Sequence, residues 1–152
     1  MKRFFYFFMI AGLITSFFDV TAQDDQSGIA SKIYARKIAF FTEKLALTPE
    51  EAEKFWPVYN EYTTKKNDIN KERNDLMKYY LRNEKNLTEK ETAGILDRFI
   101  GYQEAETTLM ETYTEKFRKF LPESKVIKIY ITEVEFKREL LQETMQPRPN
   151  KR

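Results

Sequence analysis

The feature that most restricts the fold of this chain is a long apolar repeat with a marked start. Thr48 can cap a helix, Pro49 suits its first position and Glu51 can complete a capping box. After them, residues three and four positions apart fall on one helical face in heptad register: Phe55, Tyr59, Tyr62, Lys66, Ile69, Arg73, Leu76 and Tyr80. The pattern predicts a helix from Pro49 to about Asn83, about 50 Å long at about 1.5 Å per residue.

The same start signal recurs along the chain. A leucine precedes Thr88, and Glu91 follows three positions later, which predicts a third helix that begins after Thr88. Leu121, Pro122 and Glu123 open a further apolar run that extends to residue 145. The apolar residues of this predicted fourth helix are Val126, Ile127, Tyr130, Ile131, Val134, Leu140, Leu141 and Met145. A first helix is predicted from Ile29.

Few residues interrupt these patterns. The chain has only four glycines and five prolines, and no stretch alternates with period two, so strands are not expected. The sequence predicts an all-α fold, an elongated antiparallel arrangement of about four helices, with one broad face left to dimerise or to bind another partner. Pro57 lies two turns into the second helix and predicts a kink. Gly94 and Gly101 are tolerable in the third helix if a neighbouring helix packs closely there.

The first residues resemble a secretory leader. Lys2 and Arg3 precede an apolar run of about 15 residues, shorter than the roughly 20 that a spanning helix needs, and small residues follow it. We expect residues 1–22 to be a signal peptide cleaved after Ala22, which implies a periplasmic protein; the alternative is a retained anchor. The remaining expected segments are a flexible lead-in at 23–28, a single helical domain at 29–145 and a disordered basic tail at 146–152.

Composition argues against several classes of function. The chain has no histidine and no cysteine, so the commonest general base and the usual zinc ligands are missing. We therefore expect no enzyme, no cofactor and no metal site; Glu50, Glu51 and Glu53 fit the N-terminal end of a helix dipole without a metal. Removing residues 1–22 lowers the formal net charge from +2 to +1. This balance does not favour nucleic-acid binding.

One group of residues is a candidate surface for binding other polypeptides. Aromatic and basic side chains share the face of the second predicted helix, and apolar contact alternating with charge could hold unfolded segments in solution. The alternative is that the aromatic residues form an ordinary core between helices. The candidate residues are Phe55, Trp56, Tyr59, Tyr62, Lys66, Arg73 and Tyr80.

These features resemble the Spy/CpxP-like family of periplasmic helical proteins, which carry two leucine-threonine-x-x-glutamine repeats. Leu47, Thr48 and Glu51 match the first repeat with glutamate in place of glutamine. The segment from Leu121 to Lys125 matches the second repeat only loosely, because both the threonine and the glutamine are missing. The residues after the first repeat, from Phe55 to Tyr62, are similar to a branch in Bacteroidota that is often described as sensors associated with extracytoplasmic-function sigma factors.

The resemblance implies two functions. The first is an ATP-independent holdase whose partners are non-native client proteins. The second is a regulatory sensor or adaptor that acts on a membrane anti-sigma factor. The resemblance also implies a homodimer, often a curved antiparallel one. Cleavage after Ala22 would leave no stable membrane anchor. Sequence alone does not separate the two functions, because one helical surface would serve both.

Overall fold

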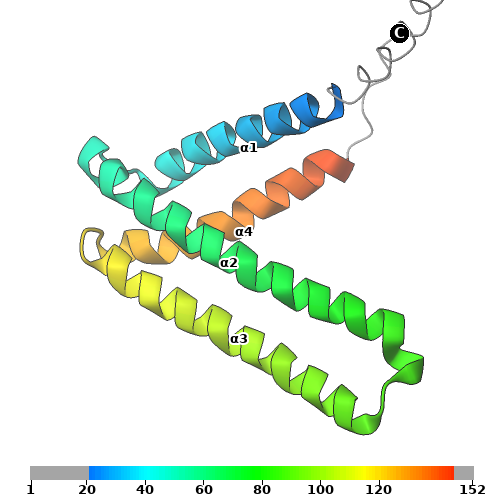
Figure 1. The fold of residues 1–152 in the computed structure, drawn as a ribbon. Helices are drawn as coiled ribbons and strands as arrows, with labels where there is room; N and C mark the ends of the chain where they lie inside the picture. Colours follow the sequence, from blue (N-terminus) through cyan, green and yellow to red (C-terminus); the bar gives the residue numbers. More distant parts are fainter. Residues whose placement is uncertain (1–20, 146–152) are drawn as a thin grey trace, which may run out of the picture. The chain divides into compact units, whose positions relative to one another are not determined.

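The fold is all-α. A computed structural model describes residues 21–145, and within them no strand occurs (Figure 1). The elements are α1 (Thr21–Leu45), α2 (Pro49–Asn83), the short 3₁₀ helix η1 (Glu84–Asn86), α3 (Glu89–Arg118) and α4 (Glu123–Met145). The predicted all-α class with about four helices is confirmed. Most of the predicted signal peptide and the basic tail at 146–152 lie outside the described residues.

The described chain divides into two contact units between Phe40 and Phe41. The single helical domain over 29–145 stays a prediction. The first unit is the helical stretch of α1 up to Phe40. α1 begins at Thr21, so it includes segment 23–28, which the sequence predicted as a lead-in. The second unit holds the last turn of α1, in which Phe41 and Leu45 are fully buried, together with the other helices.

Two capping boxes set the starts of the long helices. The Thr48 hydroxyl accepts a hydrogen bond from the Glu51 amide at 3.2 Å, and the Glu51 carboxylate accepts one from the Thr48 amide at 2.9 Å. Thr88 and Glu91 repeat this arrangement at 3.3 and 2.8 Å. These bonds satisfy amides that the first turn of a helix otherwise leaves unpaired. Both predicted helix starts are confirmed.

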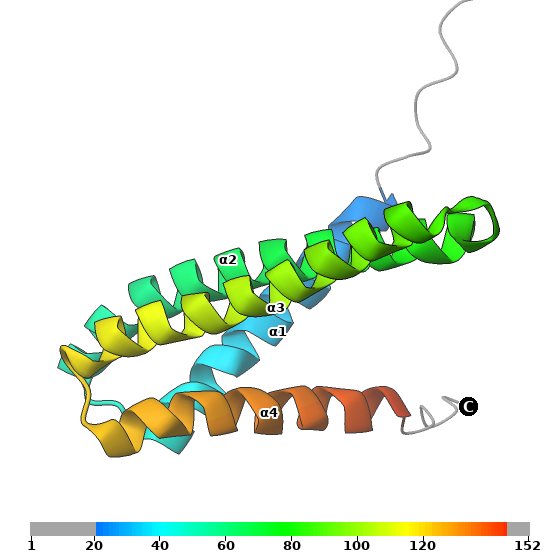
Figure 2. The same ribbon diagram turned by 90° about the horizontal axis from the view of Figure 1, so that it is seen from below.

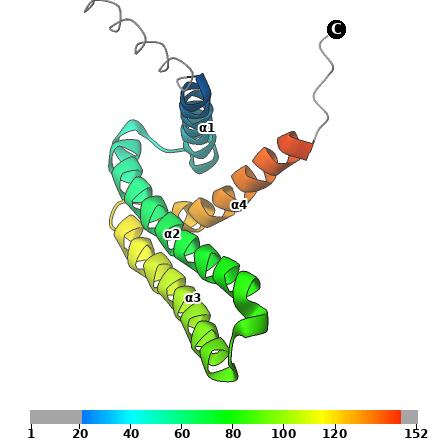
Figure 3. The same ribbon diagram turned by 45° about the vertical axis from the view of Figure 1, so that its right-hand side comes forward.

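α2 and α3 form an antiparallel hairpin joined through η1 (Figures 1 and 2). α2 runs without interruption from Pro49 to Asn83, with Pro57 inside it. The kink at Pro57 and the curved dimer stay predictions. α4 starts near the end of α3 and lies on one side of the hairpin (Figures 2 and 3).

A tight corner joins α1 to α2. Ala46 has a φ of 47°, the left-handed conformation that often ends a helix. Its amide donates to the Glu43 carbonyl at 3.0 Å, and the Leu47 amide donates to the Thr42 carbonyl at 3.2 Å. This pair of bonds is a Schellman motif, and it brings the chain to Thr48 in position to cap α2.

The core of the second unit is mainly aromatic. The Tyr59 ring lies 4.9 Å from the Phe41 ring and 5.1 Å from the Phe55 ring, measured between centroids. Tyr62 and Tyr113 are 5.3 Å apart across α2 and α3. These separations fall in the range at which aromatic pairs attract each other beyond simple burial. One aromatic layer therefore connects α1, α2 and α3.

α4 adds one of its two apolar faces to this core. Val126, Ile129 and Phe136 are buried, whereas Ile127 is 57% exposed and Ile131 is 50% exposed. The apolar residues named from the sequence belong to both faces and do not include Ile129 and Phe136. The reason is that α4 carries apolar residues at two overlapping heptad spacings, so periodicity alone does not select the buried one.

The glycines of α3 are not explained by close packing, contrary to expectation. A Cβ atom added at Gly94 or Gly101 would meet no atom within 4 Å. Neither residue therefore makes room for a neighbouring helix, and each only weakens α3 through its backbone freedom.

Replacement of Gly94 by alanine should stabilise the protein by about 1 kcal/mol, because alanine has the higher helix propensity and open space surrounds the site. Urea unfolding followed by circular dichroism measures this change. A destabilised Gly94→Ala variant would show that the backbone at this position needs glycine.

Thr48→Ala and Thr88→Ala should each cost about 1 kcal/mol of unfolding free energy, because each removes the acceptor for an N-terminal amide. Thr48→Ser and Thr88→Ser keep the hydroxyl and serve as controls. If the serine variants lose as much as the alanine variants, the hydrogen bond is not the stabilising contact.

Candidate functional site

The structure places the predicted client-binding residues in three different environments. Phe55, Tyr59 and Tyr62 are at most 1% exposed and belong to the aromatic core. A surface that binds other polypeptides cannot include them in this conformation, so that part of the predicted surface is corrected. Trp56 is half-buried and packs edge-on against Phe55, with ring centroids 5.0 Å apart. Phe55, Tyr59 and Tyr62 thus serve as core.

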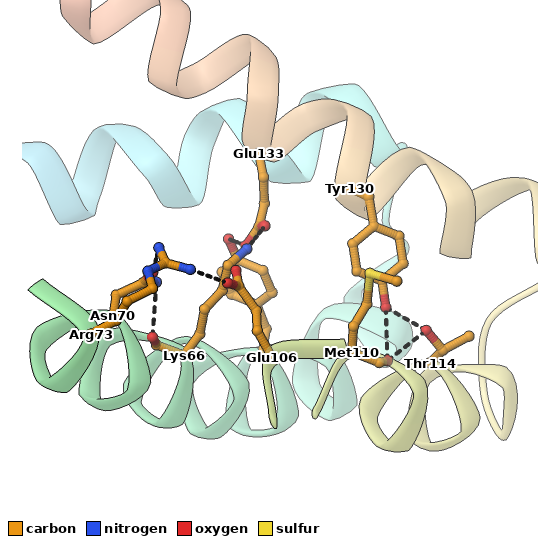
Figure 4. A network of polar contacts seen from close by, with 9 residues as sticks. Lys66, Asn70, Arg73, Glu106, Met110, Thr114, Tyr130 and Glu133 are labelled. Atoms are coloured by element: carbon orange, nitrogen blue, oxygen red, sulfur yellow. Dashed lines mark hydrogen bonds and ion pairs between the residues drawn. The ribbon is translucent and has the colours of Figure 1, made fainter. Parts of the chain in front are cut away.

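The two basic residues of the predicted surface bind other helices. The Lys66 ammonium donates to the Glu133 carboxylate of α4 at 2.8 Å, and the Arg73 guanidinium donates to Glu106 of α3 at 2.9 Å (Figure 4). Arg73 also donates to the Asn70 side chain. These two residues of the predicted binding surface therefore form half-buried ion pairs that join α2 to its neighbours.

Glu133 is the centre of a mixed network between α2 and α4. Its second carboxylate oxygen accepts a hydrogen bond from the Tyr59 hydroxyl at 3.0 Å. Burial and the Glu133 charge raise the pKa of Tyr59, so this phenol stays protonated and can donate. Burial acts to lower the pKa of Lys66, but the bond and the charge of Glu133 outweigh it, and the pKa is raised. The network is therefore a charged contact that positions α4.

The other end of α4 is held at the corner between α1 and α2. Lys125 donates to the Ala46 carbonyl at 2.7 Å and to the Glu51 carboxylate at 2.5 Å. Glu51 thus completes a helix cap and binds α4 with the same carboxylate. At the family-motif positions of α4, Leu121 is buried, Pro122 is exposed and Glu123 accepts from Arg118 at 2.8 Å. Leu121 therefore contributes to the core, and Glu123 forms an ion pair with Arg118.

An apolar groove of about 450 Å³ lies at the η1 end of the α2–α3 hairpin. Leu81 and Leu96 are 66% and 57% exposed on its two sides, and Met77 is 46% exposed. Tyr80 is the one predicted client-binding residue that lines it. The lining residues are Leu76, Met77, Tyr80, Leu81, Thr92, Ile95, Leu96 and Phe99. We call this feature the hairpin groove.

The sequence analysis missed the hairpin groove because it treated each helix as having one apolar seam. Met77 and Leu81 lie four positions apart on α2, off that seam, and Leu96 lies beside Ile95 on α3. The sequence did offer a signal for the groove, namely apolar residues that lie outside the main seam near the ends of both helices. Glu133, which joins Tyr59 to Lys66, was also missed, because no pattern within one helix reveals a contact across 67 positions.

Within residues 21–145, no cluster of three or more acidic side chains is placed to hold a metal ion. None of the helices in that range is long and apolar enough to cross a bilayer. Comparisons with protein-family models, curated proteins and solved structures found no match to this chain. The resemblance to the Spy/CpxP-like family therefore stays a prediction.

Glu51→Gln should destabilise the protein more than Glu91→Gln at pH 7. Both residues complete capping boxes, but only Glu51 also accepts from Lys125 of α4. That hydrogen bond, followed by the one from the Thr48 amide, lowers the pKa of Glu51 from its ordinary 4.5. A lowered carboxyl pKa gives stability that is present above 4.5 and is lost as the pH falls through the lowered value.

The difference in unfolding free energy between Glu51→Gln and Glu91→Gln should consequently shrink at a pH well below 4.5. At that pH the glutamates of the natural chain are themselves protonated. Urea midpoints at both pH values measure it. A difference that does not depend on pH would mean that Lys125 contributes no charge interaction.

Proposed function

We propose that this chain is an exported, non-enzymatic protein that binds apolar segments of non-native polypeptides as an ATP-independent holdase. The observation that carries the proposal is the hairpin groove, whose lining is almost entirely apolar and whose leucines are more than half exposed. Exposed apolar patches on a folded chain are typical of binding sites. The leader-like residues 1–22 support a periplasmic location.

The composition of the hairpin groove suits varied ligands. Met77 and the leucines have flexible side chains that can adapt to different apolar partners, as promiscuous binding surfaces do. Charged residues near the groove, among them Lys78, Arg82, Asp97 and Arg98, are exposed and carry both signs. Such a border would keep a complex with an unfolded segment soluble without selecting one charge pattern.

A regulatory sensor or adaptor that acts on a membrane anti-sigma factor is the second candidate. The small size of the hairpin groove favours it, because about 450 Å³ accommodates only a few side chains of one docked segment. A defined partner with a short apolar motif would fill such a groove.

Leu81→Glu combined with Leu96→Glu should abolish suppression of aggregation, because a charge on each side makes burial of apolar segments unfavourable. The assay follows light scattering of several unrelated denatured proteins at near-stoichiometric ratios. Tyr79→Glu is the control, since Tyr79 is 52% exposed on the same helical turn as Leu81 but does not line the groove.

Three outcomes separate the candidates. Protection of several clients that the double variant loses and Tyr79→Glu keeps supports the holdase. Capture of one envelope protein in a pull-down, without protection of clients and with the same dependence on the leucines, supports the adaptor. Equal activity of the natural chain and the double variant in both assays would refute a role for the hairpin groove.

A further inference from the structure

The hairpin groove lies on the same face of the hairpin that binds α4 nearer the open end, the end opposite η1. There the Tyr130 hydroxyl of α4 lies 2.5 Å from the Thr114 hydroxyl and donates to the Met110 carbonyl at 3.4 Å (Figure 4). Thr92 and Leu96 line the groove on the same helix. They precede Met110 and Thr114 by eighteen positions each, which is five full turns of an α-helix. The groove therefore continues a face that already binds one helix.

α4 does not cover this part of the face. Its ion pair with α2 joins Glu133 to Lys66 at 2.8 Å, ten positions before the first groove residue of α2. Beyond that contact α4 diverges from the hairpin (Figures 1 and 3). Leu81 and Leu96 consequently stay 66% and 57% exposed. The η1 end of the hairpin thus offers a second place for a helix on the same face.

The apolar side chains of the groove have the spacing that receives a helix. Met77 and Leu81 lie four positions apart on α2, and Thr92 and Leu96 lie four positions apart on α3. Side chains four positions apart form the ridges between which the side chains of another helix pack. A groove of about 450 Å³ holds a few such side chains, the number that two or three turns of one apolar stripe present.

The two edges of this face carry opposite charges. On α2, Lys78 directly follows Met77, and Lys71 lies two turns closer to the open end. On α3, Asp97 directly follows the exposed groove leucine, and Glu104 lies two turns closer to the open end. One position turns a helix by about 100°, so these residues lie on the outer edges of the face. All four charged side chains are exposed.

We infer that the hairpin groove binds an amphipathic α-helix of another polypeptide. The acidic edge of this helix lies along Lys71 and Lys78, and its basic edge lies along Asp97 and Glu104. The inference rests on the proposed function, because it names the class of ligand for the same groove. An unfolded segment has no fixed faces that could meet both edges at once, whereas a helix presents an apolar stripe and two edges together.

The opposite signs of the edges also select the direction of the bound helix. A helix turned end for end exchanges its two edges, so only one direction brings each edge to the opposite charge. Lys78 keeps donors for such a ligand, because an ammonium has three and its contact with Asp75 is an exposed pair at 3.5 Å. The contact is short, so a dissociation constant in the micromolar range or weaker is expected.

Fluorescence anisotropy of labelled synthetic peptides with the exported chain tests the inference. The first peptide has about 18 residues, enough for a stable helix, with leucines at alternating three- and four-residue spacing, glutamates on one edge and lysines on the other. The second is the same peptide with a central proline, which interrupts the helix. The third carries lysines on both edges. The first peptide should bind at least tenfold more tightly than either of the others.

A reversal of one edge should reverse the choice of peptide. Lys71→Glu combined with Lys78→Glu makes both edges acidic, so the peptide with two lysine edges should then bind more tightly than the mixed one. Lys54→Glu combined with Lys128→Glu is the control, because it changes the net charge equally at exposed positions outside the groove. Circular dichroism checks that each variant keeps its helices, and the peptide comparison on the natural chain needs no variant.

The outcomes separate this inference from the proposed function. Equal binding of the helical and the proline peptide, lost in the Leu81→Glu, Leu96→Glu variant, would refute the helix as ligand and leave the groove as a binding site. An unchanged preference after reversal of the α2 edge would refute the charge selection. If no peptide binds while the groove leucines still protect clients, only this inference fails. A natural chain that neither binds a peptide nor protects a client refutes the holdase as well.

Discussion

The aromatic layer around Tyr59 is the contact on which the rest of the second unit depends. Its ring packs between Phe41 and Phe55 while its hydroxyl reaches Glu133 of α4. A phenol serves this position because its body is apolar and its edge is polar, so one side chain joins the core to a charged network. A phenylalanine there would keep the packing and leave the Glu133 carboxylate with one partner fewer.

Half-buried ion pairs add specificity to this layer. Apolar rings attract one another in many relative positions, whereas the Lys66–Glu133 and Arg73–Glu106 pairs require one alignment of α2 with α4 and with α3. A slip of one turn would leave charges half-buried and unpaired, which is strongly unfavourable. The polar residues in the apolar repeat of α2 therefore fix the register of the helices more than they add to net stability.

Much of the fold could be predicted from the sequence because its signals are local. A threonine followed three positions later by glutamate forms its cap within one helical turn, so the starts at Pro49 and Glu89 were predicted correctly. The buried face of α4 could not be predicted, since two overlapping apolar spacings compete and only packing against the other helices of the second unit decides between them. The candidate site was wrong for Phe55, Tyr59 and Tyr62 for the same reason, because a pattern marks a shared face without telling whether a neighbour covers it.

The two exposed apolar surfaces lie on different parts of the second unit. The hairpin groove lies at the η1 end of α2 and α3, whereas Ile127, Ile131 and Val134 lie on α4, which starts near the opposite end of the hairpin (Figure 2). The hairpin groove and the exposed face of α4 share no residue. A ligand in the groove would therefore leave the apolar face of α4 uncovered, so occupation of the groove cannot by itself account for that face.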